Sequence, residues 1–251
     1  MKKTIKKILI AASPLLVFLF MFYVIEFLVR GLKMPYYVMT PPIQSLVYFV
    51  ENTSLVLQQC LITLKNYFIG YPIGAALGIV LAFIFTTRVR IEKAFSPYLT
   101  VISCVPMIVM VPLFKIWFGL GPIVNILVCI LSCFSIVCSN AILGISAVPA
   151  DRMELIETFK GTKLQAFVYV VIPSALPHIS TGLKLGSIFA LSGIIGSEMI
   201  GSMEGIGYQI VWSNTYFKIE ALFAYIYLLM LFGYVIFSLL DLMERSITKV
   251  S

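Results

Sequence analysis

Long apolar segments constrain this chain more than any other feature of its sequence. A helix needs about 20 apolar residues to cross the hydrocarbon core of a bilayer. Six stretches approach or exceed that length: 8–28, 67–85, 95–118, 123–143, 179–195 and 222–240. Only 12% of the residues are charged, about half the share found in soluble domains. The sequence therefore predicts an all-α integral membrane protein with about six spans, formed by a single transmembrane domain over residues 1–251.

The N-terminal region predicts a retained span followed by a helix that lies on the membrane surface. Four lysines precede the apolar run 8–28, which is longer than the apolar core of a cleaved signal peptide. Thr40 and Pro41 resemble a cap and a first helical residue. Apolar side chains then recur on one face, which predicts a short amphipathic helix along the outer interface. These residues are Ile43, Leu46, Val47 and Val50.

Two stripes of small residues predict close helix packing. Gly70, Gly74, Gly78 and Ala82 recur every four residues in the second apolar run, and Gly182, Gly186 and Ala190 do so in the fifth. Such stripes let helices approach closely. We expect packing within the subunit, with a dimer seam as the alternative.

Prolines interrupt the third apolar run, which contains Pro97, Pro106 and Pro112. Proline frees a backbone carbonyl, and at membrane depth such a group persists where protein or a water-filled cavity satisfies it. Broken helices line many transport pathways, and kinked packing helices are the alternative.

A polar segment between the fourth and fifth apolar runs has the pattern of two short, capped helices. Asp151 and Glu154 have the spacing of a capping box, and so do Thr162 and Gln165. Gly161 between them predicts a left-handed C-terminal cap. Pro173 and Pro177 should end the second helix, because proline cannot donate to a helix ladder. The segment 151–173 should form a rigid structure that a partner in the aqueous phase can bind.

The same segment resembles the EAA loop of ABC importer permeases. The resemblance is carried by 154–163 (ELIETFKGTK), 170–177 (VVIPSALP) and 181–184 (TGLK). Residues 112–121 and 198–208 are similar to the sulfonate, nitrate and taurine branch, and the likeness spans roughly 40–245. Leu155 and Ile156 replace two alanines, Lys160 stands where a glycine is usual, and Gly161 follows one place later.

The resemblance implies a type I ABC importer permease architecture with a cytoplasmic coupling loop at about 145–175. We predict that this loop contacts the ATPase through Glu154, Glu157, Lys160, Gly161, Thr162 and Lys163. We predict that Pro106, Pro112, Lys115 and Glu198 belong to the transport pathway. Lys115 has two interpretations. Its stem packs on apolar surface while its ammonium reaches the headgroups, or it faces the pathway and attracts an anionic solute.

The distribution of basic residues predicts the orientation. Most of the 18 Lys and Arg fall at ends that share one side if the N-terminus is cytoplasmic, as the positive-inside rule requires. We therefore expect a multi-pass protein of the cell membrane, inner or plasma, with both termini in the cytoplasm. The net charge of +7 follows from this bias, so nucleic acid is not expected as a partner.

The sequence carries no catalytic or metal-binding pattern. His178 has no nucleophile or ligand set nearby, the five cysteines lie in apolar stretches, and no Gly-x-x-x-x-Gly-Lys-Ser/Thr phosphate loop occurs. We expect a transport subunit and not an enzyme, with no cofactor of its own. The resemblance implies two permease subunits, an external solute-binding protein and two cytoplasmic ATPase subunits that hold ATP and Mg²⁺. Because one chain carries one coupling loop, we expect a permease homodimer, with a heterodimer as the alternative.

The sequence leaves two questions open: which solute is carried, and which class of transporter carries it. The branch spans sulfonate-, nitrate- and taurine-like anions and thiamine-precursor-like heterocycles, and the sequence does not choose among them. An ion-gradient-driven secondary transporter is the alternative class. It would call for an inverted internal repeat and ionisable groups at mid-membrane, and the spans hold few central charges.

Overall fold

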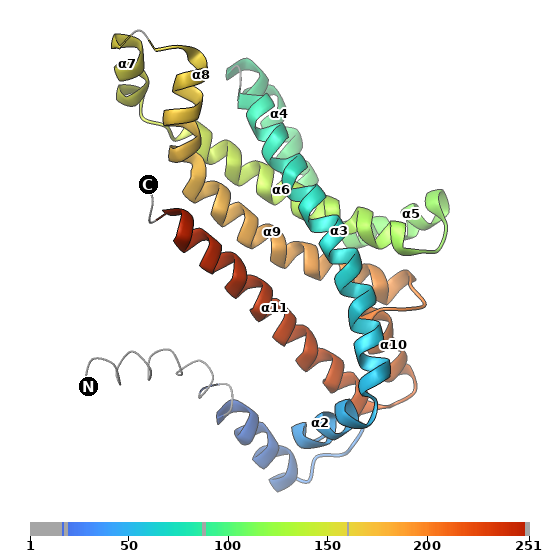
Figure 1. Cartoon of the computed structure of the whole chain (residues 1–251). Helices are drawn as coiled ribbons and strands as arrows, with labels where there is room; N and C mark the ends of the chain where they lie inside the picture. The colour runs from blue at the N-terminus through green and yellow to red at the C-terminus, as the bar shows by residue number, and fades with distance from the viewer. Residues whose placement is uncertain (1–16, 18–19, 87–88, 160, 249–251) are drawn as a thin grey trace, which may run out of the picture. The chain divides into compact units, whose positions relative to one another are not determined.

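The described part of the chain is built from helices and connecting turns. The structure, a computed structural model, describes residues 17, 20–86, 89–159 and 161–248 (Figure 1). Residues 20–31 are helical, and the later elements follow in chain order. They are α2 (Pro42–Glu51), α3 (Thr53–Thr86), α4 (Val89–Cys104), a 3₁₀ turn (Met107–Met110), α5 (Val111–Phe118), α6 (Pro122–Ser146), α7 (Ala150–Thr158), α8 (Lys163–Ala166), a π turn (Phe167–Val171), α9 (Ile172–Gly201), α10 (Ile206–Thr215) and α11 (Ile219–Thr248). The predicted all-α class is confirmed.

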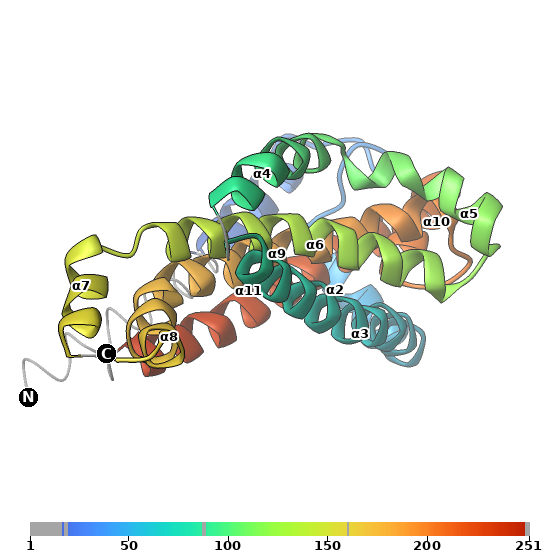
Figure 2. The same ribbon diagram turned by 90° about the horizontal axis from the view of Figure 1, so that it is seen from above.

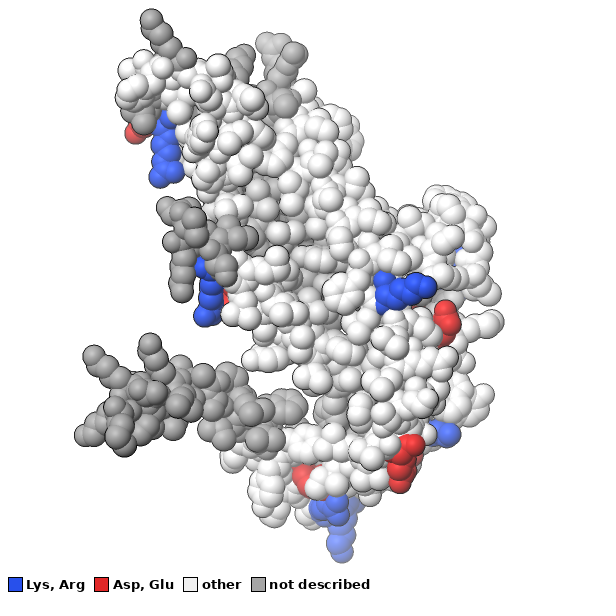
Figure 3. Space-filling view, viewed as in Figure 1, with Lys and Arg blue, Asp and Glu red and all other residues white. Residues whose placement is uncertain are grey.

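Four helices are long and apolar enough to cross a membrane. They are Thr53–Thr86, Pro122–Ser146, Leu164–Gly201 and Ile219–Arg245, and they contain the second, fourth, fifth and sixth predicted spans. Much of the first predicted span lies outside the described residues, so the total of about six remains a prediction. On the face seen in Figure 3, charged side chains are sparse and most of the surface is uncharged.

The third predicted span is not one continuous helix. Helix α4 ends at Cys104, and the 3₁₀ turn and α5 follow Pro106. Proline lacks the N–H that a continuing helix would use and restricts the residue before it, which explains the break. Pro112 is accepted in the first turn of α5, and Pro97 lies inside α4.

The chain forms two compact units, of which unit 1 comprises residues 1–58 and 209–228. Within it, the backbone N–H of Ile43 donates to Glu26 Oε2 at 3.0 Å, which joins the first helix to α2. Thr40 does not cap α2 as predicted. Pro41 is the cap residue and Pro42 opens the helix, because adjacent prolines move the start one residue along. The four apolar residues of the predicted interfacial face are exposed, as the prediction requires.

Unit 2 comprises residues 59–208 and 229–251, and α6 lies at its core. In both views α6 runs beside α9 (Figure 1 and Figure 2). A Cβ at Gly74 of α3 would lie 2.7 Å from the Ile130 carbonyl of α6, and one at Gly186 of α9 would lie 2.7 Å from Val137. The small-residue stripes therefore pack within the subunit, as expected.

Buried cysteines complete that core. Cys129 and Cys133 are fully buried among Tyr67, Val137 and Ile194. Cys104, in contrast, is exposed. In unit 2, Lys184 of α9 forms ion pairs with two residues of α11: Asp241, at 3.3 Å, and Glu244.

Candidate functional site

The first helix of the predicted coupling loop begins earlier than the capping pattern predicts. Helix α7 starts at Ala150, which places Asp151 inside its first turn and not at the cap. The Arg152 N–H donates to the Pro149 carbonyl at 3.2 Å, so the first turn has already closed before Asp151 could cap it. A carboxylate in this position still favours the positive end of the helix dipole.

Gly161 serves close packing and not a left-handed cap. Its N–H donates to the Ile156 carbonyl at 2.8 Å, and the glycines with positive φ in the described chain are Gly119, Gly121 and Gly205. A Cβ at Gly161 would lie 2.6 Å from Ile156 Cγ2 and 3.0 Å from the Ile156 carbonyl. The glycine is required because the chain folds back against the last turns of α7.

The second capping box forms as predicted. The Thr162 N–H donates to Gln165 Oε1 at 2.7 Å, and the Gln165 N–H donates to Thr162 Oγ1 at 3.3 Å. These two bonds satisfy donors that a helix start leaves unpaired. They fix the point at which α8 leaves the turn at Gly161.

The helix that starts here does not end at the prolines. Helix α8, the π turn and α9 follow without interruption, and the helix runs from Leu164 to Gly201 over 38 residues. Pro173 opens α9 and Pro177 lies inside it. A π turn shifts the hydrogen-bond register, so the turn at Phe167–Val171 accommodates the missing donor without breaking the helix. The prediction that Pro173 and Pro177 end the helix is wrong.

The predicted coupling residues surround this turn. Glu154 and Thr162 are exposed, Glu157 belongs to α7, Lys163 opens α8, and Lys160 lies outside the described residues. Exposed apolar residues were missing from the prediction. They are Phe159 at 77%, Leu164 at 71% and Tyr169 at 72% exposure. Large apolar side chains in a polar segment are the sequence signal that could have identified them. The contact of this surface with an ATPase remains a prediction.

A small cavity lies at the break in the third apolar run. Its volume is about 110 Å³, and Pro106 lines it together with Phe189 of α9 and the hydroxyl-bearing Ser132 and Ser135 of α6. The other lining residues are Ile102, Val105, Met107 and Ile136. None of the eight lining residues is charged. Pro112 is not among them.

Lys115 bonds the end of another helix. Its Nζ donates to the Ile200 carbonyl at 2.7 Å, in the last turn of α9. Helix C-termini leave carbonyls unpaired and attract cations. A Cβ at Gly201 would lie 2.6 Å from Lys115 Nζ, so glycine at this position leaves room for the lysine. Neither of the two sequence interpretations foresaw this contact.

Glu198 is fully buried near the same end of α9. Its carboxylate accepts hydrogen bonds from Thr63 Oγ1 of α3, at 2.9 and 3.0 Å, and from the Gly207 N–H at 2.9 Å. Thr63 was not identified from the sequence. The sequence signal that could have identified Thr63 is its position one helical turn from Gln59, as a second polar residue in an apolar helix.

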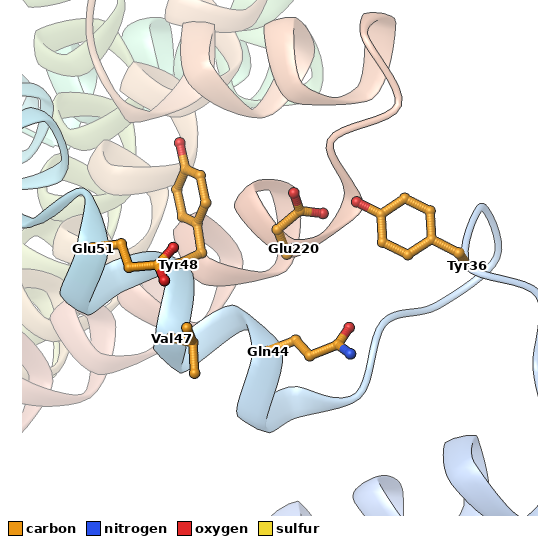
Figure 4. A pocket seen from close by; sticks show the side chains of 6 residues that line it. All are labelled: Tyr36, Gln44, Val47, Tyr48, Glu51 and Glu220. Atoms are coloured by element: carbon orange, nitrogen blue, oxygen red, sulfur yellow. The ribbon is translucent and has the colours of Figure 1, made fainter.

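Unit 1 carries a separate pocket of about 340 Å³ (Figure 4). Glu51 of α2 and Glu220 of α11 contribute carboxylates, and Tyr36 extends toward Glu220. The remaining lining residues are Gln44, Val47 and Tyr48. Two acidic groups with no basic residue among the lining side chains make this pocket unfavourable for an anion.

The sequence matches one family model and several characterised proteins. The model described as "Binding-protein-dependent transport system inner membrane component" matches residues 74–249. The formylaminopyrimidine transport permease protein of Halalkalibacterium halodurans is 30% identical over 94% of both chains. The putative aliphatic sulfonates transport permease protein of Bacillus subtilis is 30% identical over 72% of this chain and 66% of its own length. The taurine transport system permease protein of Escherichia coli is 25% identical over 71% and 62%.

Solved structures share the fold. A chain from a crystal structure of an amino acid ABC transporter with histidines superposes with a TM-score of 0.67 at 24% identity, covering 80% of this chain and 97% of that one. An inward-facing methionine ABC transporter gives 0.61 at 18% identity, covering 78% and 95%.

Proposed function

Because this chain belongs to the family of binding-protein-dependent transport system inner membrane components and is a permease subunit of an ABC importer, we propose that it imports a thiamine-precursor-like heterocycle of the formylaminopyrimidine class. A sulfonate-, nitrate- or taurine-like anion is the second candidate. The ion-gradient-driven secondary transporter considered from the sequence is not retained.

The uncharged cavity at the Pro106 break carries the choice of solute. Phe189 offers an aromatic face, and Ser132 and Ser135 offer hydroxyls that donate to ring nitrogens and accept from amino groups. An anion held in this uncharged cavity would need cations or several hydrogen-bond donors to replace the water molecules that it loses. Lys184 and Lys115 are the nearest basic residues along the chain. Lys184 is paired with Asp241 and Glu244, and Lys115 is bonded to the Ile200 carbonyl.

The relatives support the same choice. The formylaminopyrimidine permease aligns over 94% of both chains, whereas the sulfonate and taurine permeases align over smaller shares at equal or lower identity. Identity at these levels does not transfer a solute by itself. The cavity chemistry is therefore the observation on which the proposal rests.

The assembly proposed for the chain is a permease homodimer that receives solute from an external binding protein. Two cytoplasmic ATPase subunits hold ATP and Mg²⁺ and perform the hydrolysis, so this chain is not itself an enzyme. Both termini lie on the cytoplasmic side of the cell membrane, as the basic residues favour. Each ATPase holds the 145–175 coupling loop in a surface groove, and the exposed Phe159 is suited to fill it.

The continuous helix supports a mechanism for coupling. ATP-driven closure of the ATPases moves the two coupling loops together. Each loop passes directly into the 38-residue helix that ends at Gly201. A continuous helix transmits displacement along its length, so movement at the ATPase reaches Glu198 near the far end of α9.

Reconstitution tests the solute. The permease is assembled with its ATPase and binding protein in lipid vesicles, and ATP hydrolysis is measured with formylaminopyrimidine, taurine, an alkanesulfonate or nitrate. We expect formylaminopyrimidine to stimulate hydrolysis and to accumulate inside the vesicles. Stimulation by an anion and not by formylaminopyrimidine would overturn the proposal.

A further inference from the structure

Three consecutive backbone N–H groups each donate a hydrogen bond to a side chain from another part of unit 2. The Gly205 N–H donates to Gln59 Oε1 at 2.7 Å, the Ile206 N–H to Thr63 Oγ1 at 2.9 Å, and the Gly207 N–H to Glu198 Oε2 at 2.9 Å. These are the first donors of α10, which a helix leaves unpaired. Helix starts are usually capped by a nearby residue in the sequence, whereas Gln59 and Thr63 come from α3.

Two of the three capping side chains, Thr63 and Glu198, also bond each other. The Thr63 hydroxyl donates its single proton to Glu198 while it accepts from Ile206. Glu198 and Thr63 are fully buried, and Gln59 is 8% exposed. Among the described residues, no Lys, Arg or His forms an ion pair with Glu198. The hydrogen bonds and the positive end of α10 are what compensate this buried carboxylate.

Two glycines make the close approach possible. Gly205 has φ +99°, and a Cβ there would lie 2.5 Å from both carboxylate oxygens of Glu198. A Cβ at Gly207 would lie 2.7 Å from Glu198 Cβ. The sequence Gly205-Ile206-Gly207 is therefore fitted to the carboxylate and not only to the turn.

The carboxylate lies at the opposite end of α9 from the coupling loop. In Figure 1, α7 and α8 lie at one end of α9, and the connection to α10 leaves the other end. The helix from Leu164 to Gly201 has 38 residues, which extend about 57 Å at about 1.5 Å per residue. That length exceeds the roughly 30 Å hydrocarbon core. Glu198 and the predicted coupling loop thus lie at the two ends of one continuous helix.

We propose that Gln59, Thr63 and Glu198 form a clamp that carries the movement of α9 to the start of α10 and to α3, so that the far end of the permease opens when the coupling loop moves. These are positioning residues. Glu198 of α9 accepts from Thr63 of α3 as well as from the Gly207 N–H at the start of α10, so one carboxylate joins three helices. The proposal rests on ATPase coupling through the 145–175 loop and does not depend on which solute is carried.

The test compares two threonines of α3 in the reconstituted complex. Thr63→Val keeps the side-chain shape and removes the hydroxyl of the clamp, and Thr63→Ser keeps the hydroxyl. Thr86→Val is the matched control, because Thr86 Oγ1 bonds the carbonyls of its own helix. The measured quantities are basal ATP hydrolysis, hydrolysis stimulated by loaded binding protein, and solute imported per ATP hydrolysed.

We expect Thr63→Val to retain basal hydrolysis while solute imported per ATP falls by about tenfold or more, the effect of losing a hydrogen bond to a charged group. Thr63→Ser should stay close to wild type, as should Thr86→Val. A normal import ratio in Thr63→Val, or an equal loss in Thr63→Ser and Thr86→Val, would overturn the clamp.

Phe159→Ala is measured in parallel. If it leaves stimulation intact, the coupling loop is wrongly assigned, and this failure is separate from a failure of the clamp.

A second measurement needs no substitution, so it remains decisive if Thr63→Val does not assemble. Hydrogen exchange at the Gly205–Gly207 amides is followed in the wild-type complex with and without trapped ATP. A clamp that moves as one body keeps these amides protected in both states. Fast exchange of the three amides in the ATP-trapped state would contradict the proposal, because the clamp would then open during transport.

Discussion

Lys115 and Ile200 are joined by a hydrogen bond that ties α5 to the end of α9. The ammonium Nζ lies 2.7 Å from the Ile200 carbonyl oxygen, across 85 residues of sequence. The lysine therefore satisfies one carbonyl that the helix end leaves unpaired. This contact gives a cation within an apolar helix a structural role that does not involve the solute.

Lys115→Met should lower stability more than transport. Removing the charged donor from the end of α9 should cost about 0.5–1 kcal/mol, read as a lower melting temperature of the detergent-solubilised permease. Lys115→Arg is the control, since it retains a cationic donor. Unchanged melting together with weaker uptake of an anionic solute would instead support the pathway interpretation.

Gly161→Ala should uncouple the ATPase. The added Cβ would press against Ile156 at the end of α7, so the angle between α7 and α8 should change while the membrane-spanning helices remain intact. We expect a stable complex whose hydrolysis no longer responds to loaded binding protein. Gly31→Ala is the matched control, because a Cβ at Gly31 meets no atom within 4 Å. If loaded binding protein still stimulates ATP hydrolysis normally in Gly161→Ala, this turn does not couple the ATPase to transport.

Gly74→Ala should destabilise the packing of α3 on α6. The new methyl would lie 2.7 Å from the Ile130 carbonyl, and overpacking of this kind costs about 1–3 kcal/mol. Gly233→Ala in α11 provides the comparison, since its nearest neighbour would be 3.7 Å away. Thermal unfolding in detergent should show a lower midpoint for Gly74→Ala only. Equal midpoints would mean that the helices separate easily at this contact.

Cysteine labelling should reveal the orientation. Single cysteines at positions 91, 158 and 248, in a background lacking the five native thiols, should react only with reagents that enter the cytoplasm. The basic residues near these positions are the physical reason. Position 37, which the same orientation places outside, serves as the positive control for an impermeant reagent. Labelling of position 158 by that reagent would reverse the orientation and separate the 145–175 loop from any cytoplasmic ATPase.

Much of the fold was predictable because its signals are local. Helices α6 and α11 are long and apolar enough to cross a membrane, the Thr162–Gln165 box forms between residues three apart, and the glycine stripes repeat with the helical period. Each of these patterns specifies its structure within a few turns of one helix. The coupling loop, which stays a prediction, rests on local sequence patterns of the same kind.

The tertiary structure decided what depends on distant partners. The helix continues through Pro173 and Pro177, with a π turn just before Pro173, and Gly161 is fixed by contact with Ile156 and not by a left-handed φ. Glu198 meets Thr63 across 135 residues of sequence. The sequence by itself determined the membrane-spanning class and the polar turn. Packing alone determined the partners of Glu198 and Lys115, because a buried polar group bonds whichever donor or acceptor the folded helices bring within reach.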